Sequence, residues 1–599
     1  MNTGSFESLE STYRPEHPEW FGGDANEFFF RIQEIALKSG DKIRPQVSGV
    51  TAIVGSNNAG KSTILKELKE VLANGKNSKT VAVSGVSIEK SNEISSLFSW
   101  LGAHAIFKPS TEDARQDQFV RMSDSTGHLG NMAYFWNQKD EGLRSVAPFL
   151  CFYGTAEERL KMTSSVAKRN ETDDPPSHPV HSLEGDTNLK RRLSQISERV
   201  FHQPLTLDAL AATVRLRVGK TDMTVPPADD ISTEYRNAIS ALPPLDKQGD
   251  GMRSFFGQIL PIMAANYPLV ILDEPEAFLH PPQARALGVE LGKLARDNRV
   301  QVMVATHDRS FLTGLLESEG EVTVVRVSRT ADGNSTARQL DSGVLSEIWR
   351  DPVLKYTNIL DSLFHKVVVL AESEIDCGYL AAALDNPERS SGRIPRSEYL
   401  FVQTGGKASF PKVATALHAV GVPVVAAPDF DLLRDKGDVE KLVKALGGNW
   451  GTEEDDLWRK ATNPFTSPRE PLTIGYILGA IEKAFGDRRT EAFTSEAKEE
   501  MQILTRRGNS PFADVKKYGL TAFTKESRDA VEKLLRNLEA VGIVPVHTGE
   551  LEGLAPKVVS RKGPNWLTRA LEMGEQNNEE TQKHIDRIIN SSEQLIFGD

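Results

Sequence analysis

A glycine-punctuated loop between positions 55 and 62 has the residue types needed to bind nucleotide phosphates. It reads GSNNAGKS from Gly55 to Ser62 and fits the pattern G-x4-G-K-[ST]. Glycines let backbone N–H groups wrap phosphate oxygens without a Cβ clash, Lys61 can reach the β- and γ-phosphates, and the Ser62 hydroxyl can ligate Mg²⁺. This loop predicts an ATP·Mg²⁺ site, whose expected contacts are Gly55, Asn58, Gly60, Lys61, Ser62 and Thr63.

Two later strand-like runs are expected to complete this site. LVILDE ends in Asp273 and Glu274, so the first carboxylate can hold the Mg²⁺ water shell while the second polarises the attacking water. VQVMVATH places His307 at the end of the next strand, within reach of the γ-phosphate. In QGDGMR, Gly249 and Gly251 precede a predicted helix, and we expect them to form a second phosphate-binding turn.

A separate group of carboxylates follows strand-like runs in the C-terminal half. Glu372 and Asp376 follow VVVLA and are expected to face one pocket. Asp429 and Asp431 follow VPVVAAP, and residues two apart in an extended chain point the same way, so we expect them to share a cation. The carboxyl ends of parallel strands meet at one sheet edge, and oxygen ligands without Cys or His favour Mg²⁺ or Mn²⁺. The pattern predicts a second metal site.

The elements that must position these residues alternate strand and helix, which predicts an α/β fold. We expect an irregular lead-in, a nucleotide-binding domain with a partly helical, dimerising insertion, and a second α/β domain with a helical insertion. Their expected bounds are 1–26 for the lead-in, 27–350 for the first domain with its insertion at about 155–240, and 365–599 for the second with its insertion at about 435–540.

Composition sets few further limits. The chain has 599 residues, a net charge of −12 and no apolar run long enough to cross a membrane. A net negative charge does not exclude nucleic acid, since positive charge can be confined to one groove. The polar N-terminus has no features of a signal peptide, and two cysteines cannot form a disulfide framework, so we expect a cytoplasmic protein without a membrane partner.

The order of these elements resembles that of the ABC-type ATPase head, as in SMC-like proteins. A P-loop comes first, followed by a glycine turn before a helix, a strand ending in DEP and a strand ending in TH. In that family the glycine turn of one subunit completes the partner's site. The resemblance therefore implies that ATP joins two copies of the chain, and so a homodimer or higher homo-oligomer. QGDGMR differs from the transporter-type signature.

The second carboxylate group resembles the Toprim domain: a glutamate in an E-x-x-x-[DE] turn, then glycines, then D-x-D. A Toprim domain behind an ABC-type head is similar to the OLD (overcoming lysogenization defect) family of ATP-dependent nucleases. In that family further acidic and basic groups follow the D-x-D. On that match GELEGL makes Glu552 a second-metal ligand and Glu550 a lesser candidate, and Lys562, rather than Lys557, the lysine that neutralises transition-state charge.

The resemblance implies an ATP-regulated, divalent-metal-dependent DNA endonuclease, such as those of Gabija-type and retron-associated anti-phage defence. It implies, as a defence partner, a helicase-like protein or a retron reverse transcriptase with its RNA–DNA product. Two alternatives stay open: an ATP-dependent DNA-binding clamp or repair mediator with an inactive Toprim site, and an RNA (tRNA) nuclease of the same architecture. The sequence does not decide whether ATP activates or inhibits cleavage.

Overall fold

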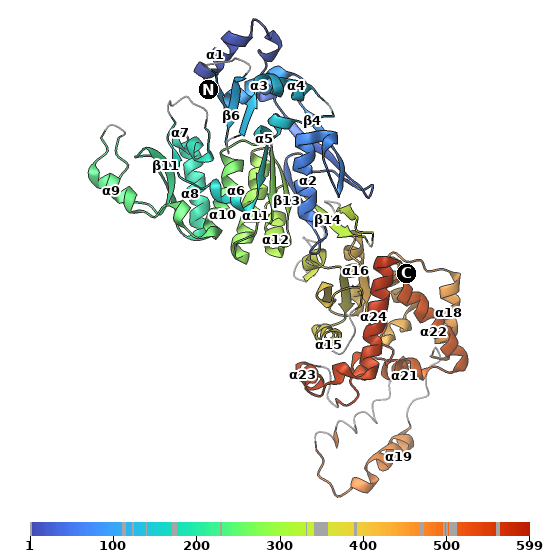
Figure 1. The fold of residues 1–599 in the computed structure, drawn as a ribbon. Coiled ribbons are helices and arrows are strands. Elements are labelled where there is room, and N and C mark those ends of the chain that lie inside the picture. The colour runs from blue at the N-terminus through green and yellow to red at the C-terminus, as the bar shows by residue number, and fades with distance from the viewer. Residues whose placement is uncertain are drawn as a thin grey trace. The chain divides into compact units, whose positions relative to one another are not determined.

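The computed structural model divides the chain into two compact units, Met1–Trp349 and Arg350–Asp599 (Figure 1). Each unit is built from strands and helices, which confirms the predicted α/β class. The residues that the structure describes are 3–110, 116–122, 125–138, 140–169, 176–227, 230–330, 332–340, 358–387, 392–465, 473–494, 497–498, 501, 512–558 and 563–598.

A six-stranded sheet forms the centre of the first unit, with strand order β15-β14-β3-β13-β12-β8. All neighbours are parallel except the β14–β15 pair at one edge. Its inner strands are almost wholly buried, because a parallel sheet is covered on both faces and its strands read as continuous apolar runs. The strands are β3 Gly49–Val54, β8 Cys151–Gly154, β12 Leu269–Asp273, β13 Gln301–Ala305, β14 Val322–Arg329 and β15 Ser335–Gln339.

Helices that adjoin these strands in the chain position the loops of the nucleotide site. They are α2 Lys61–Asn74, α10 Asp250–Met263, α11 Pro281–Asp297 and α12 Arg309–Glu317. Two small antiparallel sheets add to this unit, with orders β2-β1-β4 and β5-β6-β7. Their elements, with the nearby helices, are β1 Phe30–Leu37, β2 Lys42–Ile43, β4 Val83–Lys90, α3 Ile94–His104, β5 Ile106–Lys108, β6 Gln118–Arg121, β7 Ser125–His128, α4 Leu129–Asn137 and α5 Ala147–Leu150.

The first 26 residues, expected to be an irregular lead-in, contain helix α1 (Thr3–Tyr13) and two short 3-10 turns, Pro18–Trp20 and Ala25–Glu27. Leu9, Trp20 and Phe21 are buried in the hydrophobic core of the first unit. Burial of a tryptophan and a phenylalanine contributes several kcal/mol, on the order of 1.5–3 for each such side chain, so this segment is part of the unit.

The segment between about 155 and 240, expected to be a partly helical insertion, contains helices and an antiparallel sheet of order β10-β11-β9. The run TVRLRV alternates polar and apolar residues with a period of two, which is a strand pattern. Its elements are α6 Ala156–Lys161, β9 Val166–Ala167, α7 Ser182–Gly185, α8 Thr187–Phe201, β10 Leu205–Asp208, β11 Thr213–Val218 and α9 Thr233–Ala241.

The second unit contains a parallel sheet of order β17-β16-β18, formed by β16 Val367–Ala371, β17 Tyr399–Gln403 and β18 Val424–Ala426. The strand-like run GIVPVHT continues it beside β18 through only two isolated parallel bridges, Ala426 with Ile543 and Asp429 with Val546. Pro545 lies between them and cannot donate a ladder hydrogen bond, which explains why no regular strand forms there.

Helices make up the rest of the second unit. They are α15 Glu374–Leu384, α16 Phe410–Ala419, α17 Lys436–Ala445, α18 Thr452–Thr462, α19 Ile474–Phe485, α21 Phe512–Tyr518, α22 Lys525–Ala540, α23 Pro564–Glu572 and α24 Glu579–Phe597. None of the helices in the described ranges combines the length and the hydropathy needed to cross a bilayer.

Close packing of α10 against α6 depends on Gly257. A Cβ at this position would lie 1.9 Å from the carbonyl oxygen of Arg159. We therefore expect Gly257→Ala to lower the free energy of unfolding by roughly 1–3 kcal/mol through overpacking. Urea unfolding measures this. Gly130→Ala in α4, where a Cβ meets nothing within 4 Å, is the matched control, and equal effects of the two substitutions would contradict the prediction.

A buried histidine is expected to make the second unit sensitive to acid. His584 is 0% exposed, and burial, with the charges of Arg587 and His547, holds its pKa well below the usual histidine value of 6.5. Below about pH 6.5 the unfolded chain binds a proton that the folded chain excludes, so stability falls by up to about 1.4 kcal/mol per pH unit. Urea unfolding at several pH values should show a smaller loss in His584→Gln.

Candidate functional site

At two positions in the loop between β3 and α2, the backbone has a conformation that only glycine accommodates. Gly55 has φ of 147° and Gly60 has φ of 102°. A Cβ on Gly55 would lie 2.1 Å from the Val327 carbonyl oxygen, and one on Gly60 would lie 2.4 Å from Ser335 Oγ. Asn58, with φ of 63°, is also left-handed, which asparagine tolerates better than most residues. The predicted phosphate-binding loop therefore has the backbone shape that close approach to an anion requires.

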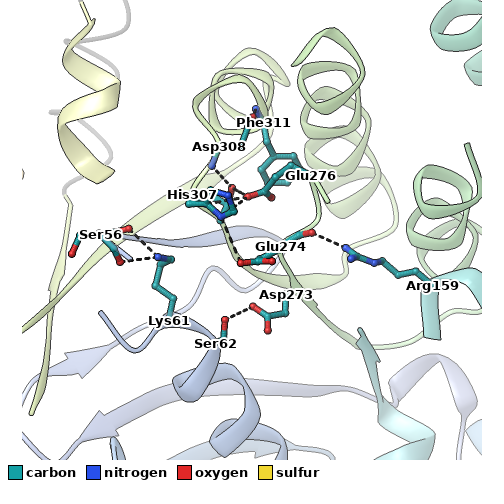
Figure 2. A network of polar contacts seen from close by, with 12 residues as sticks. Ser56, Lys61, Ser62, Arg159, Asp273, Glu274, Glu276, His307, Asp308 and Phe311 are labelled. Atoms are coloured by element: carbon teal, nitrogen blue, oxygen red, sulfur yellow. Dashed lines mark hydrogen bonds and ion pairs between the residues drawn. The ribbon is translucent and has the colours of Figure 1, made fainter. Parts of the chain in front are cut away.

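The charged and hydroxyl groups of this loop are held in place by hydrogen bonds (Figure 2). Lys61 Nζ donates to the carbonyls of Gly55 at 2.9 Å and Ser56 at 3.0 Å. Ser62 Oγ donates to Asp273 Oδ1 at 2.7 Å. Serine hydroxyl and aspartate oxygens are hard donors that suit Mg²⁺, so this pair fits the ion that accompanies ATP.

Most of the predicted phosphate contacts line one open pocket of about 730 Å³, whereas Gly55 and His307 are not among the described residues that line it. Lys61, Ser62, Thr63 and Glu274 face it, and Arg329 at the end of β14 adds a positive charge that sequence reasoning had not considered. Asn58 and Gly60 also belong to its lining. The volume and the cationic groups suit a nucleoside triphosphate.

Glu274 occupies a strained turn directly after β12. Its φ is 49°, a left-handed value that is uncommon for a residue other than glycine. The turn is held by its N–H, which donates to the Ala305 carbonyl at 2.9 Å, and by Arg159 Nη1, which donates to the Glu274 carbonyl at 2.9 Å. The Glu274 side chain is 55% exposed. The carboxylate is therefore available to a bound molecule while the backbone is fixed.

His307 lies between two glutamates (Figure 2). Its Nδ1 is 3.6 Å from Glu274 Oε1 and 3.4 Å from Glu276 Oε1. The structure thus brings together Asp273, Glu274 and His307 at the carboxyl ends of neighbouring strands β12 and β13, next to Ser62.

The two glycines of QGDGMR lie at the start of α10. Gly249 is its N-terminal cap residue. A Cβ on Gly251 would lie 2.8 Å from the Phe278 carbonyl, in the turn that follows Glu274. Gly251 therefore allows α10 to pack closely on that turn, and a phosphate-binding role of the two glycines stays a prediction.

Besides Arg329, two further residues of this site were missed from the sequence. Arg159 is 1% exposed, and burial lowers its pKa while Glu276, Asp273 and Glu274 oppose that effect. No local motif marks Arg159, since only the packing of α6 brings it to Glu274. Glu276 was visible in the run DEPE but was not assigned a role.

In the second unit, the predicted carboxylates follow strands whose carboxyl ends lie at one sheet edge. Glu372 follows β16, the central strand, and its carbonyl accepts hydrogen bonds from the N–H groups of Gly405 and Gly406, which follow β17. Asp429 follows β18, and its Oδ1 accepts the Leu551 N–H at 3.1 Å, which brings the segment of Glu550 and Glu552 to the same edge.

Asp429 has an extended backbone, with φ of −60° and ψ of 155°, but the chain turns directly after it, so the expected geometric reason for a shared cation is wrong. Strand β18 ends at Ala426, and Asp431 lies in a 3-10 turn, Phe430–Arg434, that begins directly after Asp429. A turn of three residues per repeat directs these side chains differently. Asp431 Oδ2 instead contacts Lys407 Nζ at 3.2 Å and Lys516 Nζ at 3.9 Å.

Lys516 connects the carboxylates of this edge. Its Nζ also lies 3.0 Å from Glu550 Oε1. Burial by itself would lower the pKa of Lys516, but the hydrogen bond to Glu550 and the charges of Glu550, Asp431 and Asp429 outweigh it, so the pKa is raised. The structure therefore places Lys407 and Lys516 beside Asp431. Lys557 pairs with the buried Glu575 at 2.9 Å, and Lys562 lies outside the described residues.

Asp376 has a structural contact as well. Its Oδ2 accepts the Ser373 N–H at 2.9 Å in a capping box at the start of α15, and the residue is 4% exposed. In the described part of the chain no three acidic, histidine or cysteine side chains are arranged to hold one metal ion. The oxygen donors at this edge fit Mg²⁺ or Mn²⁺ chemically, but binding one ion among several of them requires side-chain rotation.

The fold and the loop geometry define the first unit as a P-loop ATPase domain whose elements follow the predicted ABC-type order. A family model described as "AAA domain, putative AbiEii toxin, Type IV TA system" matches residues 108–313. The chain is also 25% identical over 171 residues to the Old nuclease of Escherichia phage P2, which confirms the resemblance to OLD-type ATPase nucleases.

This match covers 28% of the chain and 28% of the phage protein, so the chain aligns with only about a quarter of that relative. Among solved structures, the SMC head domain from Thermotoga maritima is 14% identical and covers 52% of this chain and 99% of its own, with a TM-score of 0.27. An SMC head with an extended coiled coil from Pyrococcus furiosus is 13% identical, covers 53% and 98%, and has a TM-score of 0.32. Scores this low carry no further conclusion.

Proposed function

We propose that the chain is an ATP-regulated, divalent-metal-dependent DNA endonuclease of the OLD type. The observation that carries this proposal is the grouping of carboxylates at the carboxyl edge of the second parallel sheet, in a chain whose first unit holds a P-loop ATPase site. The similarity to the Old nuclease supports the same class.

At the second site, Glu372, Asp376, Asp429, Asp431 and Glu552 would hold Mg²⁺ or Mn²⁺, which activates water and stabilises the leaving oxygen of a phosphodiester. Lys516 and Lys407 would offset part of the negative charge of Asp431, which would otherwise repel the phosphates of a bound DNA backbone. Lys562 stays a candidate for neutralising transition-state charge. We propose that this unit is a Toprim domain, because its carboxylates and glycines follow parallel strands in the order that domain requires.

At the first site, Lys61 would bind the terminal phosphates of ATP, Ser62 and Asp273 would hold the accompanying Mg²⁺, and Glu274 would orient the attacking water. His307 contacts the γ-phosphate. Gly249 and Gly251 would meet the nucleotide of a second copy, so we propose a homodimer or higher homo-oligomer, with the 155–240 segment contributing to its contacts. We further propose a cytoplasmic role in anti-phage defence, with a partner protein as trigger.

One experiment separates this function from its rivals. Purified full-length protein is incubated with supercoiled plasmid, single-stranded DNA or total RNA, with Mg²⁺ or Mn²⁺, with and without ATP. We expect metal-dependent DNA cleavage that Glu372→Ala abolishes and that Lys61→Ala alters in its response to ATP. DNA retention without cleavage would indicate the clamp, and cleavage of RNA alone would indicate the RNase. Equal cleavage by Glu372→Ala would overturn the proposed active site.

A further inference from the structure

Glu276 lies at the junction of the two turns that carry the residues of the ATPase site. Its Oε1 accepts the Thr306 hydroxyl at 2.9 Å and the His307 N–H at 3.0 Å (Figure 2). Thr306 follows β13 directly, and Glu276 stands two residues after Glu274. A single carboxylate oxygen therefore joins the turn after β12 to the turn after β13.

The carboxylate of Glu276 is buried at an energetic cost. The side chain is 7% exposed, and its Oε2 has no hydrogen-bond partner. Burial raises the pKa of Glu276, although the bonds from His307 and Thr306 oppose that rise. A buried acid with one unsatisfied oxygen destabilises the fold, so stability alone does not explain why this position holds a glutamate.

The turn that contains Glu276 is itself clamped from the side opposite His307. Gln258 Nε2 of α10 donates to the Pro275 carbonyl at 2.9 Å. Arg159 Nη1 of α6 donates to the Glu274 carbonyl at 2.9 Å. Because the two residues before Glu276 are fixed in this way, we expect Glu276 to determine the position of His307 and not the reverse.

His307 is the exposed member of this group. Its side chain is 50% exposed, and its ring lies between the carboxylates of Glu276 and Glu274. The Glu276 carboxylate interacts electrostatically with His307 and with the Arg159 guanidinium, which also interacts with Asp273 and Glu274. Of the two glutamates beside His307, only Glu276 holds both its backbone N–H and its ring.

We propose that Glu276 is a positioning residue of the ATPase site, whose carboxylate holds His307 beside Glu274 in the orientation that ATP hydrolysis needs. This inference rests on the proposed ATPase function. Glu276 does not face the nucleotide pocket, so it acts on the reaction through His307.

The first test compares the steady-state kinetics of ATP hydrolysis of the full-length protein and Glu276→Gln. Glutamine keeps an oxygen acceptor for Thr306 and the His307 N–H but removes the charge that faces the ring. We expect kcat to fall by roughly 10- to 100-fold, the usual effect of losing a partner that orients a functional side chain, with KM nearly unchanged. Glu276→Asp, which keeps the charge, should recover part of kcat. Glu290→Gln is the matched control, because Glu290 is also a buried glutamate of this unit but pairs with Arg199.

The second test asks whether Glu276 acts through His307. If it does, Glu276→Gln should lower kcat little further in a His307→Ala background, because coupled residues are not additive. Multiplicative losses, or a wild-type kcat in Glu276→Gln, would overturn the inference. Melting temperatures show whether a loss reflects unfolding. Loss of ATP hydrolysis in Lys61→Ala would establish the ATPase activity separately. Failure of the inference and failure of the proposed function therefore give different results.

Discussion

Replacing Glu274 by glutamine should reduce ATP hydrolysis by roughly 10²–10³-fold, the range expected when a general base or water-orienting carboxylate is lost. The Glu274 carboxylate is exposed to the phosphate pocket, while its backbone is fixed by hydrogen bonds to Ala305 and Arg159. Glutamine has nearly the same shape and keeps the turn, so the substitution removes the charge without moving the site.

Binding and turnover of ATP must be measured separately to test this. We expect the Kd for ATP, measured with a fluorescent analogue, to stay within a few-fold of the wild-type value, about 1 kcal/mol or less. Glu319→Gln, an exposed glutamate of the same unit, is the control and should hydrolyse ATP normally. Turnover by Glu274→Gln at the wild-type rate would show that another residue orients the water.

Asp429→Asn is expected to lower metal-dependent DNA cleavage by at least about 100-fold, since replacing a charged ligand by an amide weakens an oxygen-ligated site for a divalent cation. Asparagine keeps the oxygen that accepts the Leu551 N–H at 3.1 Å, so the junction between the two segments should persist. The ATPase rate should be unchanged, because the substitution lies in the second unit.

A matched control for this prediction is Asp435→Asn. Asp435 caps α17 through the N–H groups of Gly437 and Asp438, and asparagine caps helices equally well. Nicking of supercoiled plasmid, measured over a range of Mg²⁺ and Mn²⁺ concentrations, distinguishes the two variants. If a higher metal concentration restores cleavage by Asp429→Asn, the result would support a ligand role for Asp429. Equal cleavage by the wild type and Asp429→Asn would exclude that role.

Much of the nucleotide site could be predicted from local sequence. A phosphate-binding loop is a short backbone motif that requires glycines, and its flanking strand and helix have clear apolar periods. The partners Asp273, Glu274 and His307 follow buried strands that are easily recognised as continuous apolar runs. The parallel pairing of β12 and β13 then brings the ends of these strands together.

The side-chain geometry of the second site could not be predicted from local sequence. Because the carboxylates follow strands, the sequence predicted that they share one sheet edge. The relative directions of the Asp429 and Asp431 side chains depend on a 3-10 turn, which the strand-like sequence before them does not predict. Lys407 and Lys516 reach Asp431 from two different segments, one before it and one after it in the chain. No spacing rule connects such residues, because their contact results from how α21 packs onto the turn after β18.

The sequence by itself determined the two-part α/β organisation, the phosphate-binding loop and the strand ends that carry acidic residues, because each is encoded in contiguous residues with a recognisable period or motif. Only the tertiary structure decided that Arg159 fixes the Glu274 turn, that Glu276 joins it to His307, and that Lys516 lies among the carboxylates of the second unit. These contacts connect residues distant in the chain, so packing rather than local propensity selects them.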